Sequence, residues 1–160
     1  MLVMPSRPAA PPGAVPAILA RIHRHWLGQV AQVLEPAIEA GASFWERWAA
    51  ARFLCDQFEG RYRLECELME SLAPLLPAHE VTQLEAERET VERLRATLIA
   101  AGRRQLGGPL VSSLSRVLLR QLRQWCGRLE AAAQGLIFEE LPPDARTHLS
   151  RLDIADDVAL

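Results

Sequence analysis

Apolar residues recur at intervals of three and four along four long segments of the chain, and this spacing constrains the fold more than any other feature. Apolar residues with this spacing lie on one face of an α-helix, so each segment is predicted to be a helix with one buried side. The segments span residues 15–41, 43–77, 82–102 and 109–141. Because no stretch alternates with period two and no Asn-Gly or Asp-Gly hairpin signal is present, strands are not expected.

Local signals set the ends of the first two helices. Pro16 suits a first helical position, because a proline there loses no internal hydrogen bond. Pro36 does remove such a bond, so we expect a kink or break near Glu35. Ser43 and Glu46 match a capping box, which predicts the start of one long second helix that runs to about residues 74–77.

The third and fourth helices carry similar signals. Thr82 and Glu85 match a second capping box, and Gly102 predicts the end of the third helix. Pro109 opens the fourth helix, whose apolar seam is unbroken. The sequence therefore predicts the bounds of both helices within a few residues.

These elements predict an all-α fold. Because the connections are short, successive helices should lie antiparallel, which gives an up-down-up-down four-helix bundle. We assign residues 1–14 to a flexible Pro- and Ala-rich segment, 15–141 to the bundle and 142–160 to a C-terminal extension. Within that extension, we expect a short helical turn at residues 143–151 and a loose tail at the last residues.

Composition bounds the partners. All 18 basic residues are arginine, and they are interspersed with 20 acidic residues to give a net charge of -2. Without a dense basic patch, nucleic acid is not an expected partner. No apolar run reaches the roughly 18 to 20 residues of a membrane span, and residues 1–14 lack the apolar region of a secretory signal. We therefore expect no membrane association and a cytoplasmic location.

The cysteines indicate no metal or disulfide framework. There are three, an odd number, and none stands in a C-x-x-C pair or at zinc-finger spacing from a histidine. We expect Cys55, Cys66 and Cys126 to be reduced thiols in the core.

His23 and His25 are the candidate cofactor-binding residues. His23 lies at the edge of the first apolar stripe, whereas His25 faces outward. Two residues along a helix place side chains on roughly opposite sides, so these histidines cannot share one metal. A lone histidine on an apolar face is more often satisfied by a neighbouring side chain than by a ligand.

Carboxylates and aromatic residues offer weaker signals. Glutamates are plentiful, but no Glu-x-x-His sequence of the kind that di-iron bundles use is present. Trp45 lies off the strict apolar seam of the second helix, which is typical of a partner surface. The remaining large rings are typical of core; they are Trp26, Trp48, Phe58, Tyr62 and Trp125.

Four local strings resemble helices of the hemerythrin-like (HHE cation-binding) family. They are ILARIHRHWLGQV at residues 18–30, LECELMESLAP at 64–74, LEAERETVERL at 84–94 and RLEAAAQGLIF at 128–138. The resemblance covers about residues 15–140 and implies a four-helix bundle that holds two iron ions through histidines and carboxylates. His23 stands where that family's first ligand stands.

The chain departs from the family's pattern at every other ligand. Leu64 takes the place of the second histidine, Arg88 that of the third-helix histidine, and Arg128 and Ala132 those of the last histidine and bridging glutamate; Leu68 or Met69 replaces a carboxylate. Arginine stays protonated and cannot ligate a metal, so the resemblance implies a bundle without a di-iron site and with no metal ligands.

An interior polar cluster is the expected substitute for the metal. Arg88 and Arg128 are expected either to pair with Glu65 or Glu87, near His23, or to extend their charged ends to solvent.

Three functions stay open. The first is a non-catalytic helical bundle, with no catalytic residues and no cofactor. It would act through protein–protein interaction or self-association, so its partner would be another protein or a further copy in a homo-oligomer. The alternative is a metal- or haem-binding bundle for iron binding, gas sensing or redox sensing, with His23 or His25 as ligand. Residues 106–108 (LGG) loosely resemble bacterial haem oxygenases but occur too early in the chain. The third is a small-ligand sensor with an aromatic pocket.

Overall fold

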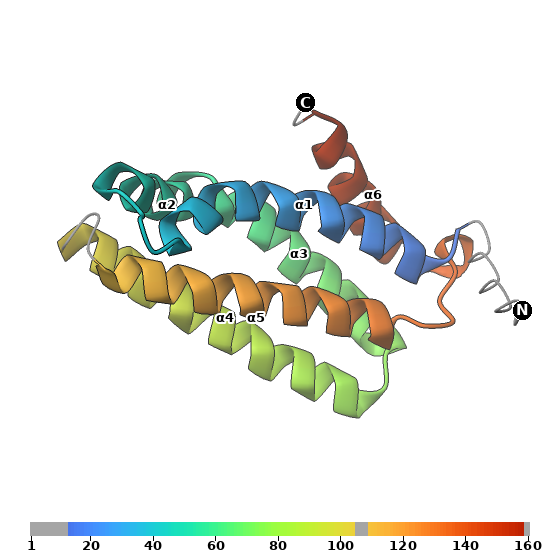
Figure 1. Ribbon diagram of the computed structural model, residues 1–160. Coiled ribbons are helices and arrows are strands. Elements are labelled where there is room, and N and C mark those ends of the chain that lie inside the picture. Colours follow the sequence, from blue (N-terminus) through green and yellow to red (C-terminus); the bar gives the residue numbers. More distant parts are fainter. Residues whose placement is uncertain (1–12, 105–108, 159–160) are drawn as a thin grey trace, which may run out of the picture.

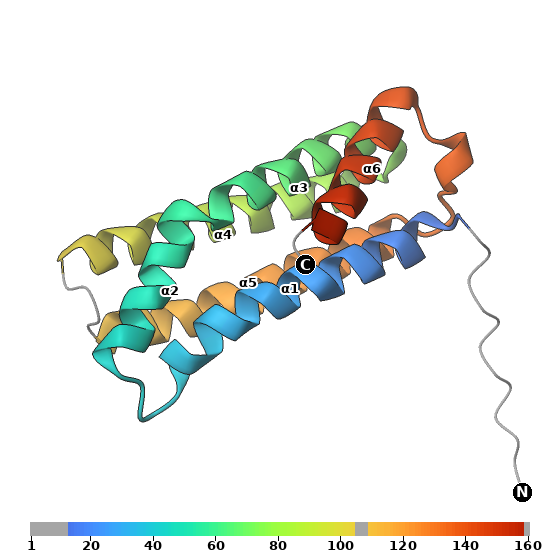
Figure 2. The ribbon, with the colours of Figure 1, turned by 90° about the horizontal axis from the view of Figure 1, so that it is seen from above.

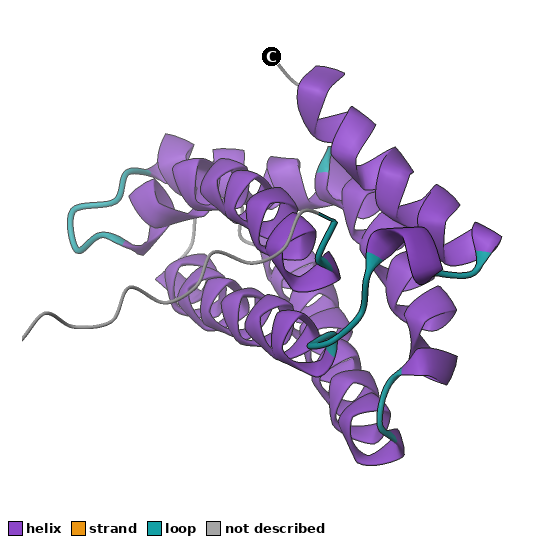
Figure 3. Cartoon of the chain, turned by 90° about the vertical axis from the view of Figure 1, so that its right-hand side faces the viewer, coloured by secondary structure: helices purple, strands orange, loops and turns teal. Residues whose placement is uncertain are grey.

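The computed structural model describes residues 13–104 and 109–158. The Leu106–Gly108 string and residues 1–12 lie outside the described residues. Within the described ranges the chain forms six α-helices and no strand, so the all-α prediction is confirmed (Figure 3). None of the described helices is long and apolar enough to cross a membrane.

The elements follow one another with short connections (Figure 1). The six α-helices are α1 (Val15–Ile38), α2 (Phe44–Asp56), α3 (Phe58–Leu72), α4 (Ala78–Arg104), α5 (Pro109–Ala132) and α6 (Pro143–Val158). Two short 3-10 helices, η1 (Ala73–Leu75) and η2 (Phe138–Glu140), lie before α4 and α6.

The helices pack around one long core. Helix α5 lies between α1 and α4, and it runs antiparallel to both (Figures 1 and 2). Helix α3 packs against α6, while α2 contacts α1, α4 and α5 at one end of the molecule. The start of α1 is fixed at the opposite end, because the Val15 amide donates to the Leu136 carbonyl and the Phe138 amide donates to the Gly13 carbonyl.

The core is built from the helical stripes that the sequence predicts. On α1, Leu19, Ile22, Trp26 and Val30 are at most 2% exposed, and α5 buries a matching row. That row contains Val111, Leu118, Leu122, Trp125 and Leu129. Burying each large apolar side chain contributes about 1.5–3 kcal/mol, so these two facing stripes supply much of the stability.

The second helix is not continuous, and the prediction of one long helix is wrong. The helix ends at Asp56, and α3 begins at Phe58, with Gln57 between them at φ -116°. The buried residues of α2 are Ala50, Ala51 and Leu54. The capping box at the start of α2 is present, since the Ser43 side chain accepts from the Glu46 amide and Glu46 accepts from the Ser43 amide.

Two further boundary predictions are wrong. Helix α1 continues through Pro36 to Ile38, so the break expected near Glu35 does not occur. The carbonyl that Pro36 leaves unpaired belongs to Gln32, which is exposed and can be hydrated. Helix α4 begins at Ala78 and not at the predicted capping box, and the Thr82 hydroxyl donates to the Ala78 carbonyl inside the helix.

The ends of α4 and α6 also differ from prediction. Helix α4 passes Gly102 and ends at Arg104. Residues 143–158 form a full helix where a short turn and a loose tail were predicted. Ala145, Leu149 and Leu152 are at most 1% exposed, because α6 packs against α3 and α1. Tertiary burial therefore stabilises a helix whose own apolar pattern is short.

Candidate functional site: a buried histidine between two carboxylates

His23 is buried in the middle of α1, where its side chain is 1% exposed. Its Nε2 lies 3.0 Å from Oε2 of Glu65 on α3, and its Nδ1 lies 2.9 Å from Oε1 of Glu130 on α5. The ring therefore joins three helices at one point. The sequence predicts His23 only at the edge of the apolar stripe, so the depth of its burial is a result of the tertiary structure.

The contacts of His23 define its protonation state. An ionised carboxylate can only accept hydrogen bonds, so a ring between two carboxylates must donate from both nitrogens. Burial by itself would lower the pKa of His23, but the negative charge of Glu65 and the hydrogen bond to Glu130 raise that pKa well above its ordinary value. His23 is thus an imidazolium at neutral pH.

Glu65 is fully buried and is held ionised by two cations. Its Oε1 lies 2.8 Å from Nη1 of Arg61, one helical turn earlier on α3. Burial would raise the pKa of Glu65, but the positive charges of His23 and Arg61 lower it below its ordinary value. The Arg61 guanidinium also lies over the Trp26 ring, 5.3 Å from its centroid. Both carboxylate oxygens therefore have a cationic partner.

Cys126 completes this group on α5. Its thiol lies beside the His23 ring and is buried. Burial raises the pKa of Cys126 although the His23 charge opposes it, so the thiol stays protonated and unreactive at neutral pH. We call the five residues His23, Arg61, Glu65, Cys126 and Glu130 the His23 cluster. Its two positive and two negative charges cancel, as a buried charged group requires.

Glu87 forms a separate polar contact between α4 and α5. It is 6% exposed, and its Oε1 accepts from Nε of Arg128 at 2.7 Å and from Gln124 at 3.1 Å. Arg88, in contrast, pairs with Glu70 at 3.1 Å. Of the five residues predicted to form one interior cluster, the structure therefore brings His23 together with Glu65, and Glu87 together with Arg128, while Arg88 pairs elsewhere.

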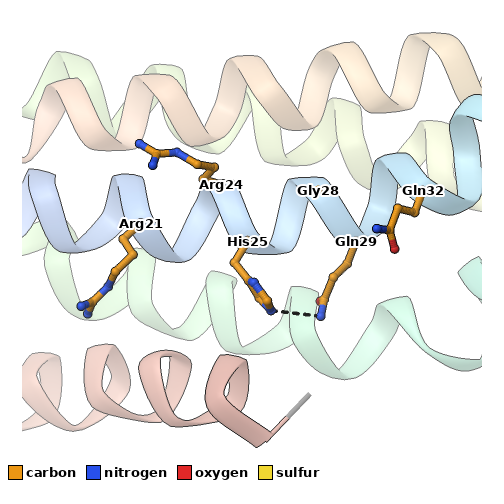
Figure 4. A pocket seen from close by; sticks show the side chains of 6 residues that line it. All are labelled: Arg21, Arg24, His25, Gly28, Gln29 and Gln32. Carbon is orange, nitrogen blue, oxygen red and sulfur yellow. Dashed lines mark hydrogen bonds between the residues drawn. The ribbon is translucent and has the colours of Figure 1, made fainter. Parts of the chain in front are cut away.

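His25 lies on the opposite side of α1. It is half-buried, and its Nε2 is 3.2 Å from the side-chain nitrogen of Gln29 (Figure 4). No contact joins it to the His23 cluster. The two candidate histidines thus belong to two different surroundings.

Sequence reasoning missed three members of the His23 cluster. Arg61 stands four residues before Glu65 on one helix face, a spacing that could have identified it. Glu130 and Cys126 give no such signal, because they are more than one hundred residues from His23 and reach it only through the pairing of α5 with α1.

The donor set does not fit a metal or haem at His23. Both ring nitrogens are engaged by carboxylates, so neither is available as a ligand without breaking an ion pair. Arg61 supplies a permanent positive charge beside Glu65, which opposes a cation there. Among the described residues, no three His, Cys, Asp or Glu side chains form a group that could hold a metal ion.

The aromatic interior is packed. Successive ring centroids of Trp26, Phe58, Tyr62 and Trp125 lie 5.8, 5.3 and 6.3 Å apart. Such direct ring contacts are typical of core packing. Trp48 is not part of this stack, because it lies on α2 beside Trp45.

Large aromatic side chains are exposed at the start of α2. Phe44 is 47% exposed and Trp45 is 70% exposed. Their rings meet edge to face at 5.3 Å, and Trp45 meets Trp48 in the same way at 6.0 Å. Arg52 lies over the Trp48 ring at 5.7 Å. We call Phe44, Trp45 and Trp48 the α2 aromatic surface.

Comparisons of the chain with family models, with curated proteins and with solved structures found no match. The hemerythrin-like resemblance therefore stays a prediction, and the geometry of the chain's own residues must carry the functional argument.

Proposed function

We propose that this protein is a non-catalytic, hemerythrin-like helical bundle that acts through its α2 aromatic surface, by binding a second copy of itself. One observation carries the proposal: Phe44 and Trp45 are 47% and 70% exposed, although each is large and apolar. Tryptophan and arginine dominate the energetics of protein interfaces, and both occur on this helix. The alternative occupant of this surface is a different protein with a complementary apolar surface.

In this proposal the rest of the molecule is a scaffold. The up-down-up-down order would have four members: α1, the broken pair of α2 and α3, α4, and α5. Helix α6 would pack on the outside of this bundle. The His23 cluster would fix α1, α3 and α5 at the position where the resembling family holds iron. Arg61 supports this, because it pairs with the fully buried Glu65 inside the bundle.

The chemistry of the aromatic surface favours a second copy. A two-fold contact places the same patch on both sides, and edge-to-face rings such as Phe44 and Trp45 can continue that packing across the axis. One acidic side chain of α2 is neutralised, since Asp56 pairs with Arg52, which lies over the Trp48 ring.

Sedimentation velocity over a range of concentrations tests the proposal. We expect a concentration-dependent dimer for the wild type and a monomer for Trp45→Glu. Ile154→Glu is the matched control, because Ile154 is 62% exposed on α6, far from α2, and should leave the dimer unchanged. A wild type that stays monomeric contradicts the second copy as occupant.

Two further results would count against the proposal as a whole. Stoichiometric iron in the purified untagged protein, or a Soret absorption band, would instead favour the metal- or haem-binding alternative with His25 as ligand. Equal dimerisation of wild type and Trp45→Glu would place the contact elsewhere on the molecule.

A further inference from the structure

Five of the six residues that line a groove on the outer side of α1 carry hydrogen-bond donors in their side chains. Its volume is about 470 Å³, and its walls are Arg21, Arg24, His25, Gly28, Gln29 and Gln32 (Figure 4). These positions fall on one face of the helix, at spacings of three and four residues. No carboxylate is among the lining residues.

The positive charge of the groove is largely uncompensated. Arg21 pairs with Asp153 of α6 through one nitrogen at 2.8 Å, which leaves its other donors free. Among the described residues, no carboxylate pairs with Arg24. Figure 4 shows Arg24 leaving α1 on the side of α5, while Arg21 and His25 leave it on the side of α6.

Gly28 keeps the centre of the groove open. A Cβ added there would meet no atom within 4 Å, so nothing in the fold requires a glycine at this position. Glycine inside a helix is unfavourable relative to other residues, because it loses more conformational freedom on folding. Its absence of a side chain leaves the helix backbone open to a ligand between Arg24 and Gln32 (Figure 4).

We propose that this groove binds a small, soluble organic phosphate. Phosphate oxygens match the forked donors of arginine, and the carboxamides of Gln29 and Gln32 can donate to the oxygens or hydroxyls of an attached organic group. The groove volume lies in the range of small-ligand sites. This site is separate from the α2 aromatic surface, so its failure would leave the proposed self-association untouched.

Isothermal titration with sodium pyrophosphate as the probe tests the site, against sodium chloride at matched ionic strength. The wild type should bind pyrophosphate saturably, and Arg24→Gln should weaken binding about tenfold or more, because a charge-assisted contact is lost. Arg63→Gln is the matched control, since Arg63 is an exposed arginine on α3 outside the groove, and should bind like the wild type.

Gly28→Leu separates binding from folding. Leucine favours a helix over glycine and finds open space at this position, so the variant should melt no lower than the wild type. Its side chain would fill the groove, and we expect saturable pyrophosphate binding to be lost. The proposal is overturned if the wild type shows no saturable binding, or if Arg24→Gln and Gly28→Leu both bind as the wild type does.

Discussion

His23 and His25 stand two residues apart on one helix and have opposite surroundings. His23 is 1% exposed and donates to carboxylates from two other helices, whereas His25 faces the outer groove and meets one glutamine. The inner histidine therefore has a structural role, because its charged ring connects α1 to α3 and α5. The outer histidine is free for a ligand, because no helix depends on it.

The largest expected effect comes from removing the inner imidazolium. His23→Ala leaves Glu65 charged and buried with one cation fewer, and breaking a buried pair costs about 3–5 kcal/mol. Urea denaturation should show this loss in the free energy of unfolding. His25→Ala is the control and should change it by at most about 0.5 kcal/mol. Equal losses in the two variants would abolish the contrast between the two sides of α1.

A double substitution asks whether the inner charges are needed at all. His23→Leu with Glu65→Leu removes both buried charges and fills the space, and such replacements are often neutral or stabilising. Glu130 is 28% exposed and can be hydrated, but the guanidinium nitrogens of Arg61 are buried and lose Glu65 as a partner. We therefore expect the double variant to be more stable than His23→Ala in the same urea experiment, but not to reach the wild type. A double variant no more stable than His23→Ala would show that packing, and not uncompensated charge, causes the loss.

The pH dependence of the free energy of unfolding should show that His23 and Glu65 are both charged in the folded protein. His23 has a raised pKa in the folded state, so its contribution is complete below its ordinary value of 6.5 and is lost as the pH rises through the folded pKa. Glu65 has a lowered pKa, so its contribution is complete above its ordinary value of 4.5 and is lost as the pH falls through the folded pKa.

The stability gained from the pair is therefore greatest between about pH 4.5 and 6.5. Melting temperatures of the wild type, measured against the double leucine variant across the pH range, should give a difference that falls on both sides of this window. A difference that keeps rising above pH 7 would mean that His23 is neutral in the folded protein.

The smallest expected effect concerns the second interior contact. Arg128 is 33% exposed, so solvent screens its pair with Glu87, and Gln124 still donates to that carboxylate when the arginine is removed. Arg128→Met should lower the free energy of unfolding by about 1 kcal/mol, measured in urea. A loss in the free energy of unfolding as large as that of His23→Ala would show that the Glu87–Arg128 pair contributes as much to stability as the His23 cluster does.

Local sequence signals predicted the local features well. The apolar stripes of α1 and α5 and the capping box of α2 depend on residues within a few turns of one another, and their spacing is visible in the chain. The break at Gln57 and the length of α6 were not predictable in this way. They accompany tertiary contacts that no local spacing predicts: α2 packs against α1, α4 and α5, and α6 packs against α3 and α1.

The sequence by itself determined that this protein is helical, with apolar faces on α1 and α5 and a histidine near one of them. Only the tertiary structure decided that His23 is a buried cation, because its partners Glu65 and Glu130 come from helices that are distant along the chain. Charge on an imidazole depends on the groups within a few ångströms of it. Those groups are set by helix packing, whereas the helices themselves are set by the pattern of the chain.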